Sequence, residues 1–321
     1  MSIIVFTENR GGKLKKSSFE AISYAMNIAE NTSKPVVAVS VGELGDDELS
    51  ALAKYGAAKI VSVNDPAWKS NDSQAYTKLM AEIAEKENAD TFIFSHSNEG
   101  KAIAPRLAVK LKAGLITNIT GVPANFSPLT IKRKTYNGSA FQLMKIKADK
   151  AVLTINPNSC DVVEKPVDVN IEKFSHSVAG DGATKVENVD VVTGKILLTE
   201  APIVVSGGRG LKSGDNWGMI EQLGEVLGAG LACSRPVSDE GWRSHEEHVG
   251  QTGKIIAPDL YIAVGISGAI QHIGGVSGAK VLVAIDKDKE APIFKYADYG
   301  IIGDAFEVVP RLIESLQKFK A

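Results

Sequence analysis

The sequence predicts an α/β protein of two domains, an N-terminal α/β sheet domain and a C-terminal domain with a doubly wound parallel sheet. Short apolar runs such as Val36–Val41 and Leu260–Val264 alternate with stretches of helical periodicity, which is the order of a parallel sheet covered by helices. The chain has 321 residues, more than one average domain. A small, polar, Gly-containing stretch at Lys173–Gly194 has the composition of an interdomain linker.

The first domain, residues 1–190, alternates strands and helices along the chain. We expect strands at Ile3–Phe6, Val36–Val41, Lys59–Val63 and Thr91–Ser95, and helices at Ser17–Asn31, Asp46–Lys54, Ser73–Glu87 and Ala102–Lys112. Pro105 is tolerated near the start of the last helix. From Leu129 to Ile155 the pattern changes to strand-like pieces around a turn at Asn137–Gly138, which predicts an antiparallel extension of the same domain.

The second domain, residues 191–321, repeats this alternation. We expect strands at Ile203–Ser206, Leu231–Ser234, Leu260–Val264, Val281–Ile285 and Gly300–Gly303, and helices at Asp215–Leu227 and Arg311–Lys318. Short apolar runs bounded by glycine and polar residues are typical of buried parallel strands. In an open parallel sheet, ligands bind in the crevice beyond the carboxyl ends of the strands, so the residues that follow each run are the candidate site.

The composition argues against several classes of protein. A formal net charge of −2 gives no basic footprint for a nucleic acid. Cys160 and Cys233 are the two cysteines and have no CxxC spacing, which predicts no disulfide framework, zinc site or iron–sulfur cluster. No apolar run approaches the roughly 20 residues that span a bilayer. The N-terminus has no leader pattern, so we expect a cytoplasmic protein, or one of the mitochondrial matrix whose leader has been removed.

The residues after the third strand of the second domain form the strongest local candidate. Residues 267–272 open a short helix directly after a strand, where backbone N–H groups can converge on a pyrophosphate. His272 falls one turn into that helix, on the side of the crevice, although a structural histidine is the ordinary alternative. The next two strands end in Asp286 and Asp304, whose carboxylates suit ribose or adenine donors but are also common in turns. Ala305 could contribute its backbone.

Two other strand ends and one loop carry polar motifs. The stretch SGGRGLKSGDNW sits at a strand-to-helix junction and lacks the spacing of a P-loop or a dinucleotide fingerprint, so it is a generic anion loop or a plain helix cap. The motif CSRPV places Ser234 and Arg235 at a strand end, where a lone arginine is ordinarily a solvated surface charge. The loop VGQTGK has, by itself, only the signal of a turn.

Together these motifs resemble the alpha subunit of electron transfer flavoprotein. The runs LYIAVGISGAIQH, APIF and ADYGIIGD are close to that family's signature. The likeness extends through SGGRGLKSGDNW, CSRPV and VGQTGK and, more weakly, through NEGKAIAPRLAVKLKAGLITNI, so it covers most of the chain. The resemblance implies one FAD, held mainly by residues from about Ile196 to Ala321.

The resemblance also implies roles for individual residues. Arg209 would meet the phosphate or adenosine side of FAD, Arg235 would lie against the flavin ring, and Thr252 would face the ring's reactive edge. The His272 imidazole would reach a flavin carbonyl and help to hold negative charge on the reduced ring. Neither catalytic nor metal-binding residues are expected. The predicted cofactor-binding residues are Arg209, Ser234, Arg235, Val249, Gly250, Gln251, Thr252, Ser267, Gly268, Ala269, Ile270, Gln271, His272, Asp286, Asp304 and Ala305, with a backbone contact safer than a side-chain one at Asp286.

The function that the resemblance implies is electron carriage without turnover of a substrate, so the protein would not itself be an enzyme. Alpha subunits of this family form a heterodimer with a beta subunit that commonly carries AMP. Flavoprotein dehydrogenases supply the electrons, and a membrane-associated quinone oxidoreductase usually receives them. The first domain would supply the subunit contact and a scaffold, and the FAD domain would swivel through the linker.

Three alternatives stay open. A nucleotide- or NAD-dependent oxidoreductase or transferase would use the same crevice, but no dinucleotide fingerprint or catalytic constellation supports it. A bifurcating flavoprotein, which uses two FADs and NADH, is the second alternative, and the sequence features that would identify it lie mostly in the other subunit. A purely structural binding module would hold no chromophore. The segment from His245 to His248 is not a candidate zinc site, because it is one residue short of the HExxH motif.

Overall fold

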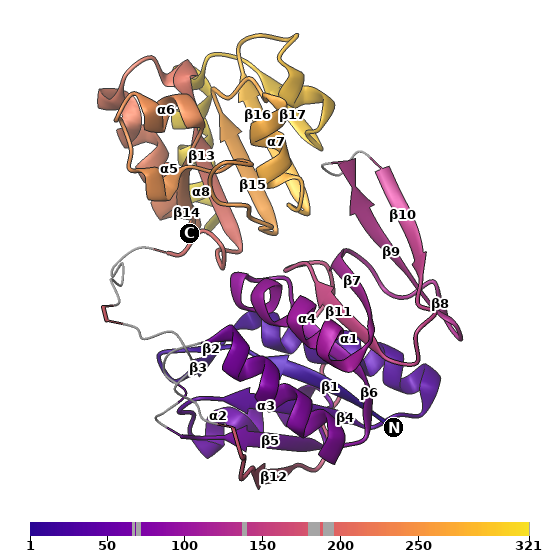
Figure 1. Ribbon diagram of the computed structural model, residues 1–321. Coiled ribbons are helices and arrows are strands. Elements are labelled where there is room, and N and C mark those ends of the chain that lie inside the picture. Colours follow the sequence, from indigo (N-terminus) through magenta and orange to yellow (C-terminus); the bar gives the residue numbers. More distant parts are fainter. Residues whose placement is uncertain (66–67, 69–71, 137–139, 179–186, 189–195, 321) are drawn as a thin grey trace. The chain divides into compact units, whose positions relative to one another are not determined.

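The computed structural model describes residues 1–65, 68, 72–136, 140–178, 187–188 and 196–320 (Figure 1). These residues belong to two compact units, Met1–Asp190 and Val191–Ala321, and each unit has its own sheet and its own hydrophobic cores. Both sheets are built mainly of parallel strands with helices packed on them, so the predicted α/β class is confirmed.

The first unit is built on a large sheet in the order β10-β9-β7-β11-β6-β1-β4-β5-β12. Its middle strands are parallel, whereas β9 pairs antiparallel with β7, β8 and β10. A separate ribbon joins β2 and β3. The strands are β1 (Ser2–Thr7), β2 (Asn9–Arg10), β3 (Lys13–Leu14), β4 (Val36–Val41), β5 (Lys59–Val63), β6 (Ala89–Ser95), β7 (Gly114–Ile119), β8 (Asn125–Phe126), β9 (Leu129–Thr135), β10 (Ala140–Lys145), β11 (Ala151–Ile155) and β12 (Asn170–Lys173).

Helices cover both faces of this sheet. Along β1, Ile3 and Val5 enter one core while Ile4 and Phe6 enter the other, because successive side chains of a strand point to opposite faces. The apolar sides of α1 and η1 join the first core, and those of α3 and α4 join the second. The helices are α1 (Lys16–Thr32), α2 (Asp46–Ser50), the 3₁₀ helix η1 (Ala51–Tyr55), α3 (Ser73–Lys86) and α4 (Asn98–Leu111).

Three features of this unit differ from the sequence-based expectation. Helix α4 begins four residues early, because the Gly100 N–H donates to the Ser97 side chain (3.0 Å) and caps it, so Pro105 lies inside the helix rather than near its start. Strand β11 is parallel and lies between β6 and β7, not in the antiparallel extension. Phe174, which was predicted to lie in the linker, is buried in the unit's core. Residues 179–186 and 189–194 of that linker, and the predicted turn at Asn137–Gly138, lie outside the described residues.

The second unit has five parallel strands in the order β14-β13-β15-β16-β17. Helices α5 and α8 pack on one face, and α7 with the 3₁₀ helix η7 packs on the other, which is a doubly wound arrangement (Figure 1). The elements are β13 (Ile203–Gly207), η4 (Arg209–Leu211), η5 (Gly214–Trp217), α5 (Gly218–Leu227), β14 (Gly230–Cys233), α6 (Arg235–Asp239), η6 (His245–Glu247), β15 (Leu260–Val264), α7 (Ile270–Val276), β16 (Val281–Asp286), η7 (Pro292–Lys295), β17 (Tyr299–Ile302) and α8 (Ala305–Lys320).

Two features of the second unit also differ from expectation. Strand β17 is the sheet edge, and Tyr299 and Ile302 are 66% and 64% exposed, so the prediction of a buried strand there is wrong. Helix α8 begins at Ala305 rather than Arg311, because the Phe306 N–H donates to the Asp304 carboxylate (3.0 Å) at the start of the helix. Among the described helices, none combines the length and hydropathy needed to cross a bilayer.

Candidate functional site

The order of the second sheet places a topological switch point between the carboxyl ends of β13 and β15. The chain runs from β13 to β14 on one side and then returns across β13 to β15 on the other, which is the topological switch point of a doubly wound sheet. The segment after β13 leads to α5 on one face, and the segment after β15 leads to α7 on the other. Ligands of such sheets bind at this position.

The loops after β13 and β15 touch through their backbones. The Gly208 N–H donates to the Val264 carbonyl (2.8 Å), and the Gly210 N–H donates to the Gly265 carbonyl (3.0 Å). A Cβ atom on Gly208 would lie 2.1 Å from the Gly265 oxygen, so a side chain has no room there. Arg209 is exposed between these two glycines. The structure therefore brings the SGGRG and GISG segments together.

The end of β14 joins the same group of loops. The Ser234 N–H donates to the Gly207 carbonyl at the end of β13 (3.1 Å), and Ser234 is buried. Arg235 is the first residue of the short helix α6, and its side chain is 64% exposed. Its Nε atom donates to Asp239 (3.2 Å), a solvent-exposed pair that constrains the guanidinium only weakly.

The loop Val249–Lys254 lies between the end of β14 and helix α7. The Val249 N–H donates to the Cys233 carbonyl (3.0 Å), and the Gln251 N–H donates to the Gln271 carbonyl (2.8 Å). A Cβ atom on Gly275 would lie 2.4 Å from the Gly250 Cα atom, so the loop and α7 meet backbone to backbone. Gln251 and Thr252 are exposed beyond this contact.

The segment from Ser267 to Gln271 carries mostly exposed residues in front of α7. Gly268 has a φ of 84° and is buried, and a Cβ atom on it would lie 2.5 Å from the Ile293 nitrogen. This left-handed conformation and close approach together require glycine. The Ile293 N–H donates to the Ser267 carbonyl (3.0 Å) and ties the segment to η7. Ser267, Ala269, Ile270 and Gln271 are left exposed.

His272 differs from the other predicted residues because its ring is buried. The side chain is 6% exposed, and its Nε2 atom lies 2.7 Å from the Tyr261 hydroxyl. Burial lowers the pKa of His272 to about 4, against the opposite effect of the Val249 carbonyl. Nδ1 is covered as well, and the expected contact of the imidazole N–H with a flavin carbonyl stays a prediction. Tyr261 had no signal in the sequence, because it lies inside an apolar run.

Asp286 and Asp304 make local turns at the two remaining strand ends. The Asp288 N–H donates to the Asp286 carboxylate (2.9 Å), and Asp304 caps α8 as described above. The Gly303 N–H donates to the Asp286 carbonyl (3.0 Å), so these strand ends are adjacent. Ala305 is buried as the first residue of α8. Both carboxylates therefore form local turns, which is the alternative to ligand binding that the sequence left open.

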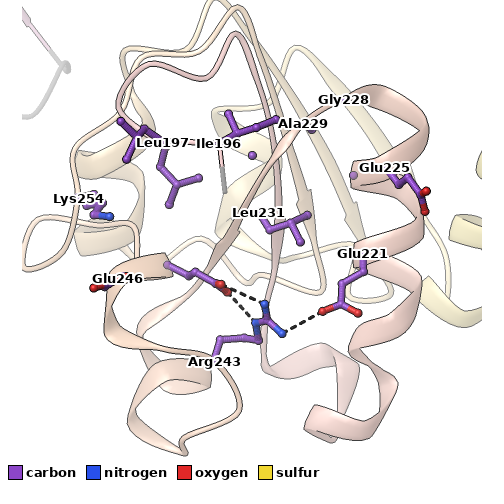
Figure 2. Close-up of a pocket in the computed structure, with 14 residues that line it drawn as sticks. Ile196, Leu197, Glu221, Glu225, Gly228, Ala229, Leu231, Arg243, Glu246 and Lys254 are labelled. Atoms are coloured by element: carbon purple, nitrogen blue, oxygen red, sulfur yellow. Dashed lines mark hydrogen bonds and ion pairs between the residues drawn. The ribbon is translucent and has the colours of Figure 1, made fainter. Parts of the chain in front are cut away.

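The second unit also has a cavity of about 330 Å³ along the β14 edge, and none of the predicted site residues lines it (Figure 2). Its walls include the apolar side chains of Ile196, Leu197 and Leu231. Arg243 donates to Glu247 (2.6 and 3.0 Å) and to Glu221 (3.0 Å), so its charge is already neutralised.

The histidine cluster near η6 is not arranged as a metal site. The rings of His245 and His248 are 5.7 Å apart, and His245 Nδ1 lies 2.6 Å from the Ser238 hydroxyl. Burial, followed by the neighbouring His245, lowers the pKa of His248. Within the described residues, no group of three or more potential ligands is placed to hold a metal ion.

Comparisons with known proteins agree over most of the chain. Residues 3–192 match the family described as "Electron transfer flavoprotein domain", and residues 197–277 match "Electron transfer flavoprotein FAD-binding domain". The chain is 40% identical to the electron transfer flavoprotein subunit alpha of Bacillus subtilis, covering 98% of this chain and 97% of that protein. The corresponding subunit of Syntrophomonas wolfei is 36% identical, with 98% of each chain covered. The mitochondrial subunit of Dictyostelium discoideum is also 36% identical, with 99% and 92% covered.

Proposed function

The chain belongs to the electron transfer flavoprotein alpha subunits, and from this premise we propose that it binds one FAD in its second unit and carries electrons without transforming a substrate. One observation carries the proposal. The loops after β13, β14 and β15 and the loop Val249–Lys254 are joined by backbone hydrogen bonds at the switch point, within the segment that matches the FAD-binding family.

The residues at this crevice fit a flavin dinucleotide. Gly208 and Gly268 are buried, and without side chains they let their loops pack directly against the Gly265 and Ile293 backbones. This packing holds the neighbouring exposed residues Arg209, Ser267 and Ala269 at the strand ends, where a pyrophosphate would be met. The covered Nδ1 of His272 makes no regular hydrogen bond. Polar side chains and backbone surround these positions, and within the described residues no group of three or more His, Cys, Asp or Glu is placed to hold a metal ion. This donor set suits holding and tuning a cofactor.

We assign the sixteen predicted residues to three parts of the cofactor. Arg209 and residues 267–271 serve the pyrophosphate and adenosine side. Ser234, Arg235 and residues 249–252 serve the flavin ring, with the Thr252 hydroxyl at its reactive edge and His272 beneath the loop. Asp286, Asp304 and Ala305 serve the ribose or adenine, through backbone groups at Asp286 because its carboxylate is engaged.

FAD supplies the redox chemistry, and the chain supplies charge, hydrogen bonds and limited exposure. A guanidinium near the flavin stabilises the negative charge that arrives with an electron, and Arg235 is free to move because its pair with Asp239 is exposed. Electron transfer breaks no bond in a substrate, so no residue needs to act as an acid, base or nucleophile.

The proposal extends to partners and to the first unit. We place the chain in a heterodimer with a beta subunit that carries AMP, with flavoprotein dehydrogenases as donors and a quinone oxidoreductase as acceptor. The first unit provides the subunit contact and a scaffold, and the second unit is the FAD domain. The compartment is the cytoplasm, or the mitochondrial matrix if a leader has been removed.

The test is a visible spectrum of the chain purified with its partner subunit, followed by extraction and quantification of the flavin. We expect a yellow complex with one FAD per heterodimer, reducible stepwise by dithionite. The complex should show no turnover of NADH or small alcohols when no dehydrogenase is present. A colourless protein that takes up no added FAD would contradict the cofactor assignment, and turnover of a small substrate would contradict the carrier assignment.

A further inference from the structure

A buried side-chain pair joins the central strand of the second sheet to helix α7. Tyr261 on β15 is fully buried, and its hydroxyl lies 2.7 Å from Nε2 of His272 on α7, which is 6% exposed. The two rings are 6.0 Å apart between centroids. Such a contact fixes the orientation of the imidazole, and the direction of its hydrogen bond sets which nitrogen carries the proton.

Burial keeps both groups in their neutral forms. Burial raises the pKa of the Tyr261 phenol, so the hydroxyl keeps its proton. Burial also lowers the pKa of His272 to about 4, and the nearby His248 acts in the same direction. A neutral imidazole has one N–H donor and one bare nitrogen that accepts. At neutral pH the hydrogen bond is therefore between a phenol and an uncharged ring.

The groups around the pair decide the direction of the hydrogen bond. The backbone of Val249 acts on the His272 ring and raises its pKa, as an accepting carbonyl does. Because Nε2 faces Tyr261, we assign this effect to Nδ1, although no hydrogen bond of regular geometry reaches that covered atom. A carbonyl oxygen favours a proton on the nitrogen that faces it. The backbones are also close, because a Cβ atom on Gly250 would lie 3.7 Å from the His272 Cα atom. With the proton on Nδ1, Nε2 is the acceptor of the Tyr261 hydroxyl.

We infer that Tyr261 is a positioning residue, which donates to Nε2 and so holds His272 as an imidazole whose single N–H, on Nδ1, faces the base of the Val249–Lys254 loop. This loop carries the residues assigned above to the flavin. The inference deepens the proposed function and rests on it only for its consequence for FAD. His272 then contributes an N–H dipole to the site, not a positive charge.

The pair also links the sheet to the loop. Without the Tyr261 hydroxyl, Nε2 would be a buried acceptor with no donor, a condition that costs free energy. The hydroxyl stabilises the ring whose Nε2 is bare, so its loss shifts the tautomers toward a proton on Nε2, which leaves the Val249 carbonyl facing a bare Nδ1. The loop that holds Gln251 and Thr252 would then lose one of its anchors.

The decisive measurement is the histidine tautomer, read by two-bond ¹⁵N–¹H NMR on the ¹⁵N-labelled full chain near neutral pH. The chain has five histidines, and the His272→Gln variant identifies the signal to follow. We expect a neutral ring protonated at Nδ1. In Tyr261→Phe, which removes only the hydroxyl, we expect the pattern to move toward protonation at Nε2. Tyr299→Phe on the exposed edge strand is the matched control and should change nothing.

Three results would overturn the inference: a positively charged His272 in the wild type, a wild-type ring protonated at Nε2, or an unchanged tautomer in folded Tyr261→Phe. The tautomer of His272 in the wild type tests the inference even if Tyr261→Phe does not fold. The second measurement is FAD affinity, which we expect Tyr261→Phe to weaken by about threefold to tenfold, the range of one lost hydrogen bond. Unchanged affinity would refute the link to the loop. A wild type that binds no FAD while showing the expected tautomer would refute only the proposed function.

Discussion

Glu99 shows how burial can outweigh the favourable field of a helix N-terminus. The residue lies in the first turn of α4, where the helix dipole stabilises a negative charge and lowers a carboxyl pKa. Burial nevertheless raises the pKa of Glu99 to about 7, and the negative charge of the buried Glu8 adds to this, while Lys15 opposes it. Glu8 is itself engaged by Lys15 (3.1 Å) and by the Ser97 hydroxyl.

This carboxyl makes the stability of the first unit depend on pH. In the unfolded chain the Glu99 carboxyl loses its proton near its ordinary pKa of about 4.5, whereas in the folded chain it keeps the proton up to about pH 7. The folded state therefore binds more protons between these values, and stability falls as pH rises through this window. We expect Glu99→Gln to raise the free energy of unfolding at about pH 8 by roughly 1–3 kcal/mol, and to change it little near pH 5.

The measurement is urea unfolding at both pH values, followed by tryptophan fluorescence, since Trp68 is buried in the same unit. Glu85→Gln is the matched control, because Glu85 is an exposed carboxylate on α3. The free energy of unfolding of Glu85→Gln should change between the two pH values as that of the wild type does. Glu99 is half-buried, and if Glu99→Gln showed the same change of unfolding free energy between the two pH values as the wild type, its raised pKa would be refuted.

At the scale of the elements, the loops after β13 and β15 hold the switch point together by direct backbone contact. Gly208 has an extended backbone with a φ of −113°, which any residue can adopt. Glycine is required only for space, because a Cβ atom would lie 2.1 Å from the Gly265 oxygen and 2.7 Å from a side-chain atom of Ile266. Neither backbone can retreat without breaking the bonds between the two loops.

We expect Gly208→Ala to lower the free energy of unfolding by about 1–3 kcal/mol, the usual cost of overpacking. Gly218→Ala is the matched control in the same unit. Gly218 is helical, with a φ of −52°, and a Cβ atom there meets nothing within 4 Å. Alanine at position 218 should therefore stabilise the chain by about 0.5–1 kcal/mol. Urea unfolding of both variants is the measurement, and equal effects would show that the two loops are not packed as described.

The elements themselves were largely predictable, because period and turn residues are local signals. Val36–Val41, Lys59–Val63 and Leu260–Val264 match β4, β5 and β15 residue for residue. The residues at which helices begin were harder to predict. The helices α4 and α8 were predicted to begin at Ala102 and Arg311, but they begin at Asn98 and Ala305. Pro105 and Pro310 lie at exposed positions inside these helices, where the carbonyl they displace can turn to water.

Pairing and burial could not be read from local patterns. Strand β11 follows the β9–β10 hairpin in sequence, but it inserts between β6 and β7, and only tertiary pairing reveals this. Strand β17 has the composition of a buried strand and lies at the edge. In the same way the candidate residues were found as motifs, whereas the burial of His272 depends on how α7 packs on β15 and brings Tyr261 beneath it.

At the scale of the whole molecule, the chain consists of two units with separate hydrophobic cores. In the first unit the core residues come from both faces of the large sheet, and in the second unit from both faces of the five-stranded sheet. No core cluster of the described residues includes members of both units. Each unit can therefore unfold on its own, and a ligand bound by one unit stabilises that unit directly.

This division predicts where FAD protects the chain. At about a hundredfold excess over its Kd, a ligand stabilises the state that binds it by about 2.7 kcal/mol, which slows exchange through unfolding by about a hundredfold. In amide hydrogen exchange with and without FAD, we expect this protection in β13 and β15, and little change in β1 and β4, although all four are buried strands. Slowing of similar size in β1 and β4 would mean that the units unfold as one. Slowing confined to the first unit would move the FAD site there, because a ligand protects most the structure that must open to release it.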